Sequence, residues 1–523
     1  GYVFEETRLT GGDHPVGERT RLGLGVLGAA LVLGVLGDLL LRATPWGINV
    51  FLWIAGLVGS VAVLAAWRGI GLRGEGRWLV VPLLLFSAFF AWRDSNTLAV
   101  VNGLAVLVAL SLAALRTRSG RLVIAGLADY FYWGLQAVGY AYAGMFPAAT
   151  QDVHWRELRV GGYGTLLAIL RGLAIASPLL LLFGGLFVAA DAVFERLVLN
   201  LFDFDPARVL GHLLLFFAIA WASAGLLRLA LIGGELPKPE GRPSFAYLGV
   251  VELGVALGLL NVLFLTFVVV QVRYLFGGED QVLASAGLTY AEYARRGFFE
   301  LVGVTALVLP LLLLAHWLLR AERPAHEKVL RLFSGSLVAL LFVVMDSALQ
   351  RMRLYQAEFG LTELRLYTTA FMFWIFAVLV WFLLTVLRGR RERFAFGALT
   401  TGFLAVALVN AINPDALIVR TNVARLEAGR EFDAPYLASL SADAVPSLME
   451  SLAAMNGDDR LAVEEVLRRR WASAAGEGWR TYNIGRSQAR DAVDTGLSGY
   501  PVMASRAGSV KGRSRTRACW GNT

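Results

Sequence analysis

The chain is poor in the residues that build metal centres and disulfides. Its 523 residues include one cysteine, Cys519, and five histidines. A single cysteine excludes an internal disulfide and a cysteine-based metal cluster. The histidines show neither H-E-x-x-H nor H-x-x-H spacing. They are His14, His154, His212, His316 and His326. We therefore expect no metal site and no cofactor.

Charge is also scarce. Charged residues make up 17% of the chain and hydrophobic residues 57%, against about 25% and about 45–50% in an average soluble protein. The sequence contains no P-loop and no G-x-S-x-G nucleophile motif, so no catalytic residue is assigned. The net charge is +8, but the basic residues lie in loops beside apolar runs. Membrane topology explains them better than a nucleic-acid partner.

Apolar runs of about twenty residues dominate the sequence instead. Such a run crosses a hydrocarbon layer about 30 Å thick as a helix, and lipid leaves the backbone no other choice. The expected fold is an all-α polytopic membrane protein of about eleven transmembrane helices in contact with the lipid bilayer. We place the spans at Leu22–Leu41, Ile48–Ala66, Trp78–Trp92, Asn96–Leu115, Gly172–Ala190, Val209–Leu227, Tyr247–Val272, Gly297–Leu319, Leu332–Gln350, Leu366–Leu387 and Phe394–Ile412.

The segment Leu122–Phe146 decides the topology. It is apolar and rich in aromatic residues, which favour the headgroup zone. If it lies in the interface, 23 Lys and Arg residues fall on the N-terminal side of the membrane and 10 on the other; if it spans, the counts become 17 and 16. Only the first distribution follows the positive-inside rule. We therefore predict a cytoplasmic N-terminus and an extracytoplasmic C-terminus.

The composition changes near Asn413, where Asn413-Pro414-Asp415 breaks the last apolar helix. Charges of both signs and helical patterns follow. The predicted organisation is a cytoplasmic segment over residues 1–21, a membrane domain over 22–412 with the interfacial segment near 122–146, a small helical extracytoplasmic domain over 413–495, and a disordered basic tail over 496–523.

Polar residues at the predicted outer ends of the spans are the candidate site. Glu292, Arg296 and Glu300 share one helical face, as do Asp346, Gln350 and Arg353. Asp346 lies about one turn inside the membrane, where a carboxylate costs on the order of 2.5–3.5 kcal/mol and needs an arginine, a raised pKa or water. The alternative is that these are helix-end charges pairing in water and headgroups. The remaining members of this outer polar cluster are Asp191, Arg295, Arg351, Glu363 and Arg365.

Several short strings together resemble a known family. They are Trp92-Arg93-Asp94-Ser95 with Asn102, Arg171-Gly172-Leu173 with Pro178-Leu179 and Ala190–Phe194, Tyr290–Leu301, Arg351–Tyr355 with Gly360-Leu361-Thr362 and Arg365, and Asn413-Pro414-Asp415 with Asn422. The pattern resembles the bacterial multi-pass membrane proteins of DUF4173, a domain-of-unknown-function family, and its close relative DUF4153. The resemblance implies a bacterial cytoplasmic (inner) membrane protein and carries over no catalytic residue.

Three functions stay open at this point. A transporter or permease would use the outer polar cluster as its mouth, for a small molecule or ion that the sequence does not identify. A structural or signalling membrane protein would bind a protein partner or envelope component through its C-terminal domain. An enzyme acting on lipid-linked substrates is disfavoured, because the outer loop around Arg42–Gly47 is short and has no acidic residue.

Overall fold

The computed structural model describes residues 16–116, 121–154, short stretches between 176 and 194, 206–233, 248–275, 298–319, 323–430, 433–472 and 478–497. These residues are helical almost throughout. The one β contact recorded among them is an isolated bridge between Leu248 and Leu319. The predicted all-α fold is confirmed.

Ten helices among the described residues are long and apolar enough to cross a membrane, and they match ten of the eleven predicted spans. The eleventh, Gly172–Ala190, lies almost wholly outside the described residues. The spanning helices are α1 (Val16–Leu41), α2 (Ile48–Arg68), η1 with α3 (Glu75–Leu79 and Val80–Trp92), α4 (Asn96–Arg116), α9 (Pro206–Leu231), α10 (Val250–Leu275), α13 (Phe298–Leu318), α14 (Pro324–Phe359), α15 (Glu363–Thr385) and α16 (Phe394–Ile412).

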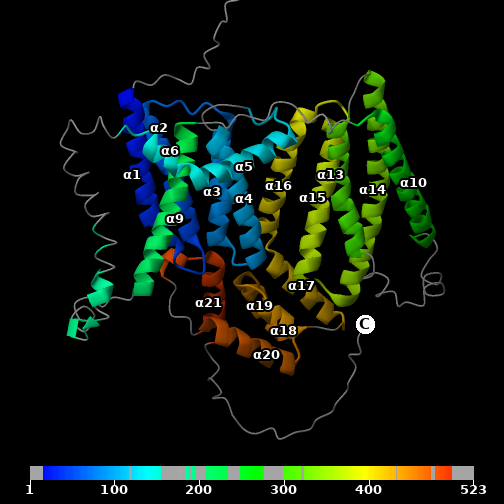
Figure 1. The fold of residues 1–523 in the computed structure, drawn as a ribbon. Coiled ribbons are helices and arrows are strands. Elements are labelled where there is room, and N and C mark those ends of the chain that lie inside the picture. Colours follow the sequence, from blue (N-terminus) through cyan, green and yellow to red (C-terminus); the bar gives the residue numbers. More distant parts are fainter. Residues whose placement is uncertain are drawn as a thin grey trace, which may run out of the picture.

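The aromatic segment after α4 runs obliquely across the spanning helices, in the part of the bundle nearer the start of α1 (Figure 1). It forms α5 (Leu127–Ala143) and α6 (Met145–Thr150). Before α5, the amide of Leu122 donates to the carboxylate of Glu75 at the start of η1 (2.6 Å). After α6, the Asp152 carboxylate accepts from Arg19 (2.8 Å) near the start of α1. The segment therefore begins and ends at the same face of the bundle, and its interfacial position stays a prediction.

The spanning helices form two groups. The first group comprises α1 to α4 and α9, and the second comprises α10, α13, α14 and α15, each around its own buried apolar residues. Helix α16 lies between them (Figure 1). It packs beside α15, and on its other side Phe403 contacts Phe86 of α3 with ring centroids 5.3 Å apart. A reciprocal pair of amide hydrogen bonds joins Asn410 to Asn102 of α4 (2.9 and 3.0 Å).

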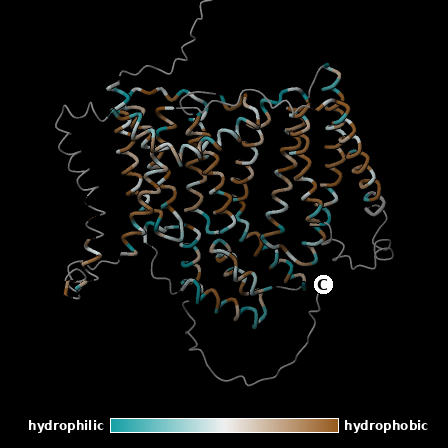
Figure 2. Tube along the Cα trace, viewed as in Figure 1, coloured by the Kyte–Doolittle hydropathy of each residue, from teal (hydrophilic) through white to brown (hydrophobic). Residues whose placement is uncertain are grey.

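The helices after Asn413 pack around a separate core at one end of the bundle (Figure 1). They are α17 (Pro414–Glu427), α18 (Ala434–Ser439), α19 (Val445–Ser451), α20 (Gly457–Leu467) and α21 (Ile484–Leu497). We call them the C-terminal unit. They are more hydrophilic than the spanning helices (Figure 2). We call the end that carries them the C-terminal face, and the end where α1 begins the N-terminal face. The predicted domain limits stay predictions.

Helix α5 crosses α9 at glycines, because a side chain there would overlap the neighbouring backbone. A Cβ on Gly225 of α9 would overlap the carbonyl oxygen of Tyr140, and a Cβ on Gly144 would lie 2.8 Å from the Cα of Gly225. Small residues allow such close approach of helices in membranes. The sequence pattern Gly254-x-x-x-Gly258 indicates close packing too, but Cβ atoms there would make only ordinary contacts with Phe333 of α14, at 3.7–3.9 Å.

We expect Gly225→Ala to destabilise the protein by about 1–3 kcal/mol, because the added methyl group must push the α5 backbone away from α9. Gly303→Ala in α13 is the matched control, since a Cβ there meets no atom within 4 Å. Unfolding temperatures of the purified protein in one detergent would be compared. Equal unfolding temperatures for the two variants would contradict the close crossing.

Candidate functional site

Five charged side chains meet where the C-terminal unit joins the bundle. They are Arg93 and Asp94 from the turn between α3 and α4, Asp415 from the first turn of α17, Asp443 from the short 3-10 helix η5 (Ala442–Ala444), and Arg486 from α21. We call them the junction cluster. The turn exists because α3 ends at Trp92 and the backbone of Arg93 becomes extended.

Asp443 and Asp94 each accept backbone amides from the other's segment. The Asp443 carboxylate accepts from the amides of Asp94 (2.7 Å) and Ser95 (3.3 Å), just ahead of α4. The Asp94 carboxylate accepts from the amide of Ala442 (3.3 Å) in η5. Carboxylates are stabilising where unpaired helical amides face them. The exchange therefore ties the start of α4 to the C-terminal unit.

Two arginines pair with these carboxylates. Arg486 donates to Asp94 (2.6 Å), and their side chains are 5% and 17% exposed. Arg93 lies 3.9 Å from Asp443, and their side chains are 10% and 2% exposed. Arg93 also donates to the carbonyl oxygen of Asn410 on α16 (2.8 Å). Ion pairs this deeply buried are costly to break, because the remaining partner is left as an uncompensated charge.

Asp415 completes the cluster. Asn413 adopts a left-handed backbone conformation (φ 56°), and its side chain caps α17 by accepting from the amide of Ala416 (3.3 Å). This places Asp415 beside Ser441, whose hydroxyl and amide both donate to one of its carboxylate oxygens. The other oxygen is buried and has no hydrogen-bond partner within the described part of the chain. A buried acceptor left without a donor raises the cost of the charged form.

Burial dominates the electrostatics of the cluster. It raises the pKa of Asp443 to about 6, with the nearby Asp415 and Asp94 adding to the rise and Arg93 opposing it. Burial likewise raises the pKa of Asp415, and the Ser441 hydrogen bonds oppose that rise. Desolvation also lowers the pKa of Arg93, against the attraction of Asp443 and Asp415. Three carboxylates therefore share two arginines in a site that water reaches poorly.

The C-terminal unit is also attached to the second helix group. Asn422 of α17 brackets Leu361 in the turn after α14, accepting from its amide (3.0 Å) and donating to its carbonyl oxygen (2.8 Å). The hydroxyl of Tyr436 accepts from the amide of Glu363 (2.9 Å). Arg430 pairs with Glu358 (3.0 Å) at the surface. The unit thus contacts both helix groups at the C-terminal face.

The outer polar cluster is only partly covered by the described residues. Glu292, Arg295 and Arg296 lie outside them, and Glu300 is exposed. Asp346 is exposed and accepts a hydrogen bond from Gln350 of its own helix (2.8 Å).

The other predicted residues of the outer polar cluster are dispersed. Arg353 is exposed, and Arg351 donates to Gln271 of α10 (3.0 Å). Asp191 accepts from the amide of Val193 (2.7 Å). Arg365 lies over the Tyr355 ring, 4.0 Å from its centroid, and with Glu363 it stands at the start of α15 beside the C-terminal unit.

Sequence reasoning missed the junction cluster as a site. Arg93, Asp94 and Asp415 entered as parts of sequence strings and not as site residues, and Asp443 and Arg486 were not singled out. The available signal was that Trp92–Ser95 and Asn413–Asp415 both belong to the strings that carry the family resemblance. The described residues contain no group of three or more His, Cys, Asp or Glu side chains placed to hold a metal ion. The contacts of the junction cluster join segments that are far apart in the sequence.

A family model described as a domain of unknown function (DUF4153) matches residues 80–451. The matched region includes Arg93, Asp94, Asp415 and Asp443, while Arg486 lies beyond it. Neither a curated protein nor a solved structure matches the chain.

We expect Asp94→Ala to lower stability by about 3–5 kcal/mol, because it leaves the buried Arg486 without its carboxylate. Glu358→Ala breaks the exposed pair with Arg430, whose side chains are 55% and 53% exposed, and should cost about 1 kcal/mol or less. Unfolding temperatures in detergent would show the difference. Adding Arg486→Met to Asp94→Ala should recover part of the loss; equal effects of the two single variants would contradict a buried junction.

The raised pKa of Asp443 predicts a pH dependence with a definite sign. Its ordinary value is 3.8, and in the folded protein it is about 6. Between these values the folded state keeps a proton that the unfolded state has lost, so stability falls as pH rises through this window. Relative to Asp443→Asn, which does not titrate, the wild type should lose about 2–3 kcal/mol between pH 4 and pH 7. A pH-independent difference in unfolding temperature would contradict this expectation.

Proposed function

The chain belongs to the DUF4153 family, a domain of unknown function, and from its junction cluster we propose that it is a structural or signalling membrane protein. In this proposal the C-terminal unit binds a protein partner or envelope component, and the junction cluster couples that event to the membrane helices. The observation that carries the proposal is the buried ionic attachment of the unit to the start of α4.

The C-terminal unit is attached to the bundle by more contacts than are needed to keep it near the membrane. A flexible linker would suffice to keep a small domain near the membrane. Here Asp443 caps the start of α4, Arg93 holds the end of α16 through Asn410, and Asn422 holds the turn after α14. A displacement of the C-terminal unit would disturb hydrogen bonds to both helix groups at once. In the proposal, this disturbance is how binding at the C-terminal unit changes the membrane helices.

The proposal places the C-terminal unit outside the cytoplasm of a bacterial cell, with the N-terminus inside. The excess of arginines and lysines at the N-terminal face supports this orientation. The bacterial cytoplasmic membrane and a relation to DUF4173 belong to the same proposal, and they rest on the sequence strings described above.

In this proposal, helix α20 carries the surface that contacts the protein partner. This helix lies on the side of the C-terminal unit that faces away from the bundle (Figure 1). Its side chains Leu461 and Val466 are 65% and 40% exposed. Large exposed apolar side chains at such a position, away from lipid, suit contact with another protein.

Transport is the second candidate, and one observation favours it. Helix α16 lies between the two helix groups yet buries only Phe394, Ala395, Gly397 and Asn410. Loose packing between two groups would permit one to rock against the other, as in transporters. However, Asp346 is exposed and bonded within its own helix, so it gives no support to an outer mouth. An enzyme acting on lipid-linked substrates gains no support from the junction cluster.

A photo-reactive amino acid placed at Leu461 tests the proposal in intact cells. Irradiation should give one discrete adduct of higher mass, because α20 presents this position to a partner. The same residue placed at Leu404 of α16, which is 60% exposed among the spanning helices, is the control and should give no protein adduct. Adding Val466→Glu should abolish the adduct at Leu461. The proposal fails if Leu461 and Leu404 give the same pattern.

A further inference from the structure

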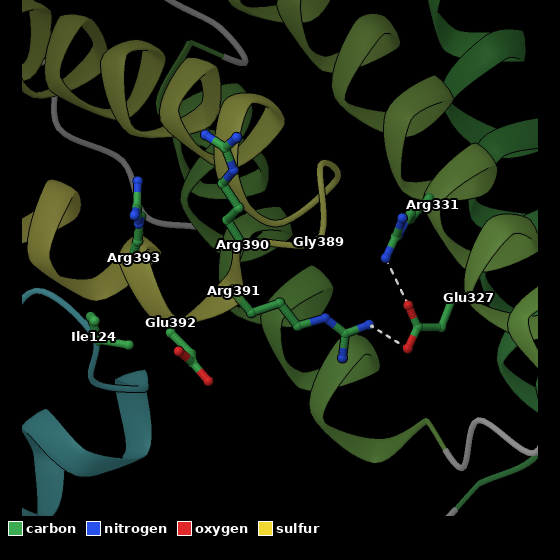
Figure 3. A pocket seen from close by; sticks show the side chains of 8 residues that line it. All are labelled: Ile124, Glu327, Arg331, Gly389, Arg390, Arg391, Glu392 and Arg393. Carbon is green, nitrogen blue, oxygen red and sulfur yellow. Dashed lines mark hydrogen bonds and ion pairs between the residues drawn. The ribbon is translucent and has the colours of Figure 1, made fainter.

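A cavity of about 500 Å³ lies at the N-terminal face, at the opposite end of the bundle from the junction cluster. Its lining comes from three segments. Ile124 precedes α5, and Glu327 and Arg331 belong to the first turns of α14. The turn between α15 and α16 supplies the other lining residues. That turn includes Arg390, Arg391 and Arg393. We call this cavity the arginine pocket (Figure 3).

Two of its arginines are held in place by one carboxylate. Glu327 accepts from Arg331 (2.7 Å) and lies 3.9 Å from Arg391. The two guanidinium groups reach it from different elements (Figure 3). Arg391 also donates to the carbonyl oxygen of His316 at the end of α13 (3.1 Å). These contacts fix the cationic groups before any ligand arrives, which lowers the entropic cost of binding.

The pocket nevertheless has an excess of positive charge. Four arginines face two carboxylates, Glu327 and Glu392. Arg390 and Arg393 are exposed, and no carboxylate pairs with either of them within the described ranges. The Nε of Arg331 is buried and has no acceptor among the described residues. A buried donor without an acceptor is costly, and an anionic oxygen would relieve that cost.

The turn between α15 and α16 also lies close to α14. Gly389 has a left-handed backbone conformation (φ 81°), and a Cβ there would lie 3.2 Å from a terminal nitrogen of Arg331. Membrane topology accounts for arginines in this turn, since they retain it on one side. Topology does not account for the shared carboxylate that holds Arg391 beside Arg331, nor for the buried Nε of Arg331.

We propose that the arginine pocket binds a phosphate-bearing anion. The guanidinium fork matches the oxygen spacing of phosphate and can donate two parallel hydrogen bonds to it. The anion is either the headgroup of an anionic phospholipid or a soluble phosphate compound, and both present the same oxygens. This binding does not depend on the function proposed for the C-terminal unit.

The test uses the full chain in nanodiscs of phosphatidylcholine. One arm adds inorganic pyrophosphate to the solution, and the other replaces part of the lipid with phosphatidylglycerol. Binding is measured by the shift in unfolding temperature and by native mass spectrometry of the retained ligand. Arg390→Gln with Arg393→Gln removes two pocket arginines without breaking an ion pair. Arg73→Gln with Arg388→Gln is the matched control, because these exposed arginines belong to the same predicted face and do not line the pocket.

We expect binding in at least one arm, weakened about tenfold or more by the pocket variant and about twofold or less by the control. Binding of phosphatidylglycerol alone identifies a lipid headgroup, and binding of pyrophosphate in pure phosphatidylcholine identifies a soluble anion. The proposal is overturned if neither probe binds. It is equally overturned if both variants weaken binding to the same extent, because the effect would then be one of general surface charge.

Discussion

The hydrocarbon layer offers no hydrogen-bond partner, and this constraint governs where the described part of the chain places its charged residues. Ten described helices satisfy their own backbone groups and place apolar side chains outward. Among the described residues, the clusters of charged side chains lie at the two ends of the bundle. At the N-terminal face, Arg19 and Arg228 both pair with Asp152, and further arginines line the arginine pocket. At the C-terminal face, charged side chains form the junction cluster.

The junction cluster and the arginine pocket differ in how far their charged side chains are exposed to water. The junction cluster is sealed between the bundle and the C-terminal unit, so its carboxylates and arginines interact in a poorly hydrated site. The arginine pocket is a cavity with exposed members, and part of its charge is unmatched within the described chain. One arrangement therefore fastens two parts of the same molecule, whereas the other is suited to an anion from outside it.

The sequence predicts the fold well because the apolar runs depend only on local composition. Ten of the spans between Leu22–Leu41 and Phe394–Ile412 could be placed from their hydropathy. The junction cluster could not be found in this way, because Asp94 and Asp443 are 349 positions apart. Local spacing drew attention to Asp346, Gln350 and Arg353 instead. Residues at that spacing share a face, but spacing does not reveal whether the face meets another helix or none.

The separation of these partners in the sequence also sets an order of assembly. Arg93 and Asp94 are synthesised with α3 and α4, whereas Asp443 follows 349 residues after Asp94 and Arg486 follows 392 residues after it. Arg93 and Asp94 are therefore made long before the residues that pair with them. A chain that has not yet reached Asp443 and Arg486 lacks their contacts to Arg93 and Asp94. Assembly of the junction cluster therefore follows synthesis of the C-terminal unit, and until then Arg93 and Asp94 stand beside the membrane without these partners.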